Sequence, residues 1–156
     1  MNRIRAVLER YERIPRWLRF TAVVLWAWML WWLSSRRGSD LEGIRIGGFI
    51  ANGAHVAFFG VLAGLVFLAW IGSPSRRLPW SAGVATAYGI VDELHQATVP
   101  GRSPSIADVL SDGAGALFAG CALLWVLGRN ASARRALPWL AGMALATVCL
   151  ATWTEL

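Results

Sequence analysis

Long apolar stretches alternate with short polar segments along most of the chain. Five stretches are long enough, or nearly so, to cross a hydrocarbon core of roughly 30 Å as helices. They cover residues 17–33, 50–71, 79–96, 106–127 and 137–153. Short connections and the lack of an internal repeat indicate one domain. The pattern therefore predicts an all-α fold, a polytopic membrane helical bundle of five transmembrane helices.

Residues 1–16 follow a different pattern and precede the first apolar stretch. One helical face collects the apolar side chains of this segment, which are Ile4, Val7, Leu8 and Tyr11. Such a basic amphipathic segment is typical of a helix resting on anionic lipid, and equally of a basic tail that only fixes orientation. No small-residue cleavage site follows the first apolar stretch, so we expect a signal anchor rather than a removed signal peptide. We divide the chain into this segment and a single transmembrane domain over residues 17–156.

Composition and charge support this division. The chain is 56% hydrophobic and only 15% charged, and it contains ten tryptophans, which favour the membrane–water interface. Cys121 and Cys149 lie within apolar stretches, so we expect packing residues rather than a disulfide or a metal site. The net charge of +6 comes from arginines that flank the apolar stretches, which argues against a nucleic-acid partner. The spacing of Gly60 and Gly64 favours close helix approach.

The arginines predict an orientation, because basic loops stay in the cytoplasm. Eleven fall on one side of the predicted bundle: Arg3, Arg5, Arg10, Arg13, Arg16, Arg19, Arg76, Arg77, Arg129, Arg134 and Arg135. Four fall on the other: Arg36, Arg37, Arg45 and Arg102. We therefore expect the N-terminus inside and the C-terminus outside.

A polar stretch, "DELHQATVPGRSPSIAD" at 92–108, interrupts the apolar pattern. At 1.5 Å of rise per helical residue, Asp92 lies roughly 20 Å above the inner boundary, Asp112 roughly 22 Å and His55 roughly 24 Å. Asp108 lies roughly 28 Å up on the same count. These groups, from three helices, thus share one level in the outer part of the membrane.

The energetic cost of these groups predicts a shared cleft. A carboxylate at mid-membrane costs about 2.5–3.5 kcal/mol, so the acids should face the bundle interior and find partners. Tyr88, Asp92 and either His95 or Gln96 form one helical stripe, with Glu93 about 100° round from Asp92. Both acids can point into one cleft if the cleft is wide or the helix ends there.

Each polar residue admits two interpretations. Asp92 and Glu93 are candidates for a general acid/base and its electrostatic partner, or for structural ion pairs with Arg102. His55 is a candidate proton shuttle or a hydrogen-bonded packing residue, and His95 is a candidate binding residue or simply solvated. Arg102 can hold a phosphate or carboxylate bidentately, or pair with Asp92 or an acid of the next helix.

Ser105 and Asp108 have the spacing of a near capping box, which favours Asp108 as a helix cap over a catalytic role. A metal site built from His55, Asp92, Glu93 and His95 is conceivable, but no compact ligand motif is present. We therefore expect no metal, and the sequence identifies no cofactor.

Around these residues the sequence resembles the VanZ-like family of small bacterial membrane proteins, over residues 34–120. The pieces are "SS" at 34–35, "HVAFFG" at 55–60, "DELHQ" at 92–96, "GRSPSIAD" at 101–108 and "DGAG" at 112–115. The resemblance picks out His55, Glu93, Gln96, Arg102, Ser103 and Asp108. This chain departs in having Asp112 where the family usually has Asn, and in lacking a basic residue shortly before His55. Both differences make the cleft less positive.

The family is named for a protein linked to low-level resistance to the lipoglycopeptide teicoplanin, which implies the cell envelope and the bacterial cytoplasmic membrane. Our first hypothesis is a hydrolase or headgroup transferase acting on a lipid or lipid-linked phosphate at an outward-facing polar cleft. Catalysis would involve Glu93, Asp92 and His55; the substrate would contact Arg102, Gln96, Ser103, Asp108, Asp112 and His95. The alternative is a non-catalytic protein that binds an acylated envelope ligand, a lipoglycopeptide or lipid, and reduces antibiotic access. The sequence leaves open whether the protein is an enzyme.

Overall fold

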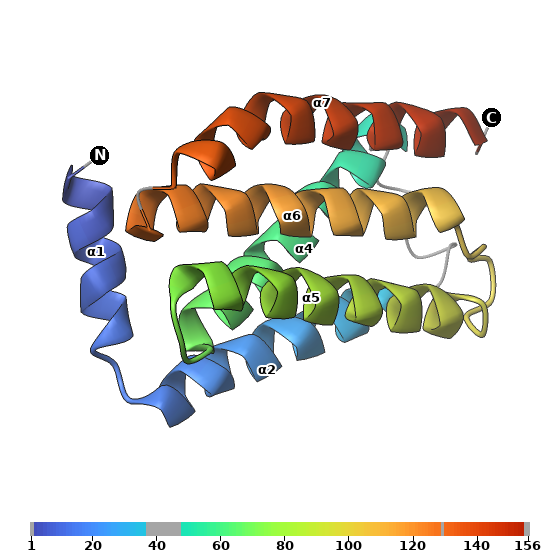
Figure 1. Cartoon of the computed structure of the whole chain (residues 1–156). Helices are drawn as coiled ribbons and strands as arrows, with labels where there is room; N and C mark the ends of the chain where they lie inside the picture. The colour runs from blue at the N-terminus through green and yellow to red at the C-terminus, as the bar shows by residue number, and fades with distance from the viewer. Residues whose placement is uncertain (1, 37–47, 129, 155–156) are drawn as a thin grey trace.

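The computed structural model describes residues 2–36, 48–128 and 130–154, and their regular structure is entirely α-helical. The described helices are α1 (Asn2–Glu12), α2 (Arg16–Ser34), α4 (Gly48–Ala69), α5 (Pro74–Gln96), α6 (Ile106–Gly128) and α7 (Ala131–Thr154). Figure 1 shows α5, α6 and α7 running lengthwise, with α4 behind them and α1 standing across one end. The all-α prediction is confirmed.

Two of the predicted helix starts were wrong. The α5 helix begins at Pro74 and not at residue 79, and α7 begins at Ala131 and not at residue 137. The true starts have local causes: Pro74 occupies the first turn, where its missing N–H costs nothing, and the Asn130 side chain accepts a hydrogen bond from the Ala133 N–H at 2.9 Å. The prolines near the two predicted starts lie inside the helices. Membrane helices tolerate such prolines because neighbouring groups satisfy the freed carbonyls.

Three of the described helices are long and apolar enough to cross a membrane, namely Phe49–Ala69, Ile106–Gly128 and Ala131–Trp153. The α2 and α5 helices are long enough but not apolar enough to be counted with these three. Helix α2 carries Arg16 and Arg19 at its start, and α5 is charged at both ends. The chain is a helical membrane protein, and crossing by α2 and α5 stays a prediction.

The α4 helix is the centre of the bundle and contacts every other described helix. Around it lie two apolar clusters, one built on Phe59 and Leu62 and the other on Phe67. Close approach to α6 depends on glycines, because a Cβ on Gly115 would overlap the Val56 carbonyl. A Cβ on Gly60 would lie 3.2 Å from the Gly115 carbonyl oxygen, which confirms the close packing predicted there.

The basic N-terminal segment forms a packed helix. Leu8 and Tyr11 of α1 pack against the second apolar cluster, and Glu12 pairs with Arg77 of α5. Ile4 and Val7, expected on the same face, are exposed. Helix α1 is therefore attached to the bundle and is not a free basic tail.

Most arginines gather at the α1 end. That end holds the starts of α2, α5 and α7 and the ends of α4 and α6 (Figure 1). Ten of the eleven arginines expected together lie on these segments; Arg129, like Arg37 and Arg45, lies outside the described residues. Arg19 is buried and donates to the carbonyl of Leu68, an acceptor left open at the end of α4.

Candidate functional site

The predicted site residues lie at the end of the bundle away from α1. His55 is near the start of α4, Asp92 to Gln96 form the last turn of α5, and Asp108 and Asp112 lie in the first two turns of α6. Arg102 and Ser103 belong to the α5–α6 connection, which Figure 1 shows far from α1. Three helix ends therefore bring these residues to one level, as helix rise predicted.

His55 and Asp112 form the link between α4 and α6. The Nδ1 atom of His55 lies 3.0 Å from Oδ1 of Asp112, whose side chain is fully buried. Room for this carboxylate comes from α5, because a Cβ on Gly89 would overlap Asp112. The pair fixes the imidazole and leaves its Nε2 atom without a hydrogen bond among the described residues.

Asp92 and Glu93 are both buried, and one amide group holds both. The Nε2 atom of Gln96 donates to Oδ2 of Asp92 at 2.9 Å and to Oε1 of Glu93 at 3.3 Å. Adjacent helical residues point about 100° apart, and they share this donor because α5 ends at Gln96. The expectation that both acids can enter one cleft stays a prediction: Asp92 lines one of the cavities described below, and Glu93 lines neither.

The start of α6 forms only half of the expected capping box. The Ser105 hydroxyl accepts the Asp108 N–H at 3.2 Å, as a capping residue should. The Ser105 N–H donates at 2.7 Å to Oε2 of Glu93, not to Asp108. Asp108 is therefore not a reciprocal cap, and its buried Oδ1 atom has no hydrogen-bond partner among the described residues.

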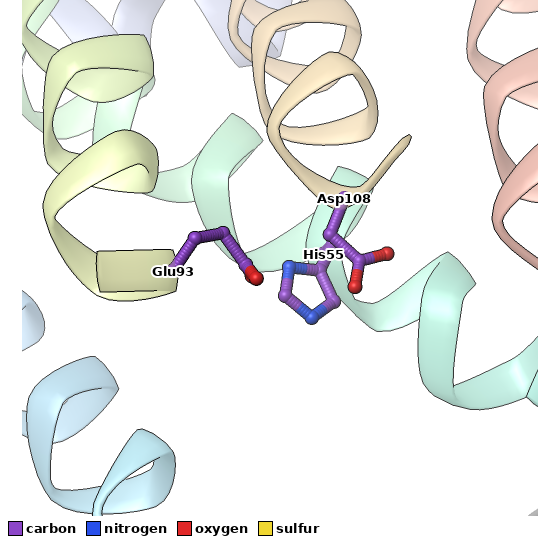
Figure 2. A group of neighbouring side chains, drawn as sticks. All are labelled: His55, Glu93 and Asp108. Atoms are coloured by element: carbon purple, nitrogen blue, oxygen red, sulfur yellow. The ribbon is translucent and has the colours of Figure 1, made fainter. Parts of the chain in front are cut away.

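His55, Glu93 and Asp108 come together although they lie on three different helices. Figure 2 shows the carboxylates of Glu93 and Asp108 on either side of the His55 ring. One nitrogen or oxygen atom from each side chain lies within 4.8 Å of the others. The metal ligands considered from sequence included His55 and Glu93 but not Asp108. Asp108 was left out because its spacing from Ser105 predicted a helix cap.

Arg102 is half-buried and forms no ion pair with any described carboxylate. Its Nε atom is buried without a hydrogen-bond partner within the described ranges. The alternative in which Arg102 only neutralises Asp92, Glu93 or Asp108 is therefore not what the structure shows. Its guanidinium remains available for an anion.

Two cavities meet at this end of the bundle. A smaller one, about 210 Å³, has walls mainly from α2 and α4, including Leu30, Phe58 and Phe59. A larger one, about 900 Å³, lies over the α5–α6 connection, and polar residues share its walls with apolar ones such as Ile106 and Leu110. Residues that line both are Ala51, His55, Gln96 and Arg102. Asp92 lines the smaller cavity only; Ser103 and Asp108 line the larger one only.

His95 has a different environment from its neighbours. Its ring stacks on Trp31 of α2 with centroids 3.8 Å apart, and its Nε2 atom lies 2.9 Å from the Ser35 hydroxyl. His95 lines neither cavity. It joins α2 to α5, a position that sequence spacing alone did not indicate.

Buried polar atoms without a partner are concentrated here. Among the described residues seven such side-chain atoms occur, and five belong to this end: those of Ser34, Asp92, Arg102, Asp108 and Asp112. Buried polar groups are otherwise almost always hydrogen-bonded, so this concentration needs an explanation. The atoms without a partner at this end comprise three carboxylate oxygens, one hydroxyl and one guanidinium nitrogen.

Sequence reasoning missed two polar residues of the cavities. Asn52 is buried one turn before His55 on α4, lines the larger cavity and donates to the Thr152 hydroxyl at 3.2 Å. Ser34 at the end of α2 lines the smaller cavity. An asparagine three residues before a histidine, in an otherwise apolar stretch, is a pattern that could have identified Asn52.

Fold and site together define a helical membrane protein with a buried polar site at one end of its bundle. The sequence matches the VanZ/LLP1 family over residues 6–129. Because this match covers well over half of the 156 residues, the chain belongs to the VanZ/LLP1 family. The resemblance drawn over residues 34–120 is confirmed and extends further at both ends. No curated protein and no solved structure matches the chain.

Proposed function

We propose that the protein binds an anionic lipid or lipid-linked phosphate at this site and acts on it as a hydrolase or headgroup transferase. In this proposal α2, α4, α5, α6 and α7 all cross the bacterial cytoplasmic membrane. The arginine-rich α1 end lies in the cytoplasm, in accord with the positive-inside rule. The site then faces the extracytoplasmic side, where envelope lipids carry their headgroups.

The observation that carries the proposal is the junction of a mainly apolar cavity with a larger one whose walls include many more polar groups. The smaller cavity presents Leu30, Phe58 and Phe59, a surface suited to an acyl or prenyl chain. The larger cavity presents hydroxyl, amide and charged groups, a surface suited to a headgroup. A ligand that spans both must be apolar at one end and polar at the other, which describes a lipid.

Arg102 favours an anionic headgroup. A guanidinium that lines both cavities without a carboxylate partner offers paired N–H donors in the geometry that phosphate oxygens match. Burial of its Nε atom strengthens such a hydrogen bond, because water competes for it less. Gln96 and Ser103 add neutral polar groups to the same walls.

Glu93 is the acid/base in this proposal. Its carboxylate lies near His55 and is held by two donors, so its orientation is fixed. In hydrolysis Glu93 takes a proton from water as the water oxygen forms a bond to phosphorus. The bond from phosphorus to the leaving oxygen breaks, and protonated Glu93 passes its proton on to that oxygen, which restores the carboxylate. Asp92, through its bond to Gln96, positions the amide that holds Glu93.

The non-catalytic alternative uses the same cavities. An acylated ligand, either a lipid or a lipoglycopeptide, would place its chain between α2 and α4 and its polar part near Arg102, with no proton transfer. The two proposals differ at Glu93, whose carboxylate is required for turnover but not for holding the chain.

Native mass spectrometry of the purified protein tests ligand binding. We expect a co-purifying lipid with an anionic headgroup, and loss of that lipid in Arg102→Gln. Arg36→Gln is the matched control, because Arg36 lies over the Trp32 ring at 3.9 Å and lines neither cavity. Equal lipid retention by both variants, or a retained lipid without negative charge, would overturn the proposed ligand.

A further inference from the structure

We propose that His55, Glu93 and Asp108 bind a divalent first-row transition-metal ion, of which Zn²⁺ and Mn²⁺ fit the donor set best. The ion would be a resident cofactor of the same site. The inference goes beyond the proposed function, since binding of the ion does not depend on which lipid the cavities take. With the ion bound, Glu93 would be one of its ligands, and the metal would lower the pKa of a bound water in place of proton transfer to a free Glu93 carboxylate. The inference replaces the expectation from sequence that no metal is bound.

The spacing of the three side chains fits one ion. Their candidate ligand atoms lie within 4.8 Å of one another. Two ligands of one tetrahedral Zn²⁺ ion, at bond lengths of about 2.0–2.2 Å, are roughly 3.3–3.6 Å apart. Side-chain rotations that move an atom by about an ångström close the remaining gap. One imidazole and two carboxylates suit zinc and manganese better than copper or an iron–sulfur cluster.

Asp108 supplies the second, independent observation. Its side chain is 6% exposed, and its Oδ1 atom has no hydrogen-bond partner among the described residues. The group that would have satisfied Asp108, the Ser105 N–H, donates to Glu93 instead. A buried carboxylate oxygen beside His55 and without a donor is a ligand atom in need of a cation.

Asp112 holds His55 as second-shell carboxylates hold metal-binding histidines. The Nδ1 atom of His55 is bonded to Asp112, so in this proposal a turn of the ring presents Nε2 to the ion. The Asp112 side chain is completely buried and is enclosed against Gly89 of α5. Such a carboxylate fixes the ring orientation and makes the other nitrogen a better ligand.

The charge balance at this end also favours a cation. Four carboxylates are buried at this end, those of Asp92, Glu93, Asp108 and Asp112, and among the described residues the cavities are lined by one arginine, Arg102, and one histidine, His55. Uncompensated charge in a membrane protein is costly, and bound metal is one of the few ways to offset it. The ion would leave Arg102 free for the substrate's negative charge and would act as a Lewis acid on a phosphate oxygen or a water molecule.

Metal titration of the purified, chelator-stripped protein in detergent tests the inference. Mn²⁺ binding is followed by electron paramagnetic resonance and Zn²⁺ binding by calorimetry. We expect one ion per chain and a Kd at least ~10-fold higher for Asp108→Asn and for Asp112→Asn. Glu9→Gln is the matched control, a neutralised carboxylate on α1 that pairs with Arg5 at the other end of the bundle, and its Kd change should stay below about fivefold. Each variant is first shown to be folded, by its elution in size-exclusion chromatography and by a cooperative unfolding transition.

Two results would overturn the metal site. One is the absence of stoichiometric Mn²⁺ or Zn²⁺ binding by folded wild type. The other is an equal loss in Glu9→Gln and Asp108→Asn, which would mean diffuse charge attraction rather than ligation. Because the titration contains no lipid, its outcome is separate from the Arg102→Gln comparison. Metal binding without lipid retention would remove the proposed ligand and leave the metal site intact.

Discussion

The Nδ1 atom of His55 lies 3.0 Å from Oδ1 of Asp112, and this contact ties α4 to α6 inside the bundle. The two residues are 57 positions apart in the chain, and the Asp112 side chain is fully buried. A polar pair in this setting is costly to maintain, which points to function. Both the proposed lipid site and the proposed metal site depend on this pair, because it orients the imidazole that lies between Glu93 and Asp108.

The His55–Asp112 pair should show strong energetic coupling. His55→Ala leaves the buried Asp112 carboxylate without its partner, so we expect a lower free energy of unfolding. His55→Ala and Asp112→Ala together should cost less than the sum of the single changes, with a coupling of about 0.5–3 kcal/mol. Denaturant unfolding in detergent measures all three variants. Additive effects would mean that the contact contributes nothing to stability.

Gly89 should be intolerant of a side chain. A Cβ at this position would overlap Asp112, so Gly89→Ala should displace the carboxylate and destabilise the protein by about 1–3 kcal/mol. Gly83 on the same helix has nothing within 4 Å of an added Cβ. Gly83→Ala should therefore be neutral, or stabilising by up to about 1 kcal/mol. Thermal unfolding of the two variants side by side is the measurement, and similar behaviour would contradict the packing of Asp112 on Gly89.

Cysteine labelling should place the two ends of the bundle on opposite sides of the membrane. The background lacks Cys121 and Cys149, and the test positions are the exposed Ser103 in the α5–α6 connection and the exposed Ser75 at the start of α5. Ser103→Cys should react with a membrane-impermeant maleimide in intact cells. Ser75→Cys should react only after lysis. The reverse pattern would put the site in the cytoplasm and refute the proposed orientation.

Helix rise and alternating topology were enough to predict that His55, Asp92 and Asp112 share a level. That prediction was correct because the rise per helical residue is fixed. An error of a few residues at a helix end therefore shifts the expected height of a side chain by only a few ångströms. The prediction even survived a wrong start for α5, since the site lies at the other end of that helix. The fold class likewise follows from apolar run lengths.

The contacts within the site could not be read from spacing. Ser105 donates its N–H to Glu93 and leaves Asp108 free, which depends on the path of the α5–α6 connection. The stacking of His95 on Trp31 depends on how α2 packs against α5. In both cases the sequence allows more than one partner, and only the tertiary packing determines which partner is used. Cys149 is a smaller case: expected to pack, it is exposed, because its face of α7 has no described neighbour to cover it.

The most direct test of the account separates binding from turnover at Glu93. The nearly isosteric Glu93→Gln variant and wild type are placed in nanodiscs containing phosphatidic acid or a polyprenyl diphosphate. Bound lipid is measured by native mass spectrometry and released inorganic phosphate by a colorimetric assay. We expect both proteins to retain lipid and only wild type to release phosphate. Phosphate release by Glu93→Gln at the wild-type rate would contradict the acid/base assignment, and lipid retention without release by either protein would favour the non-catalytic alternative.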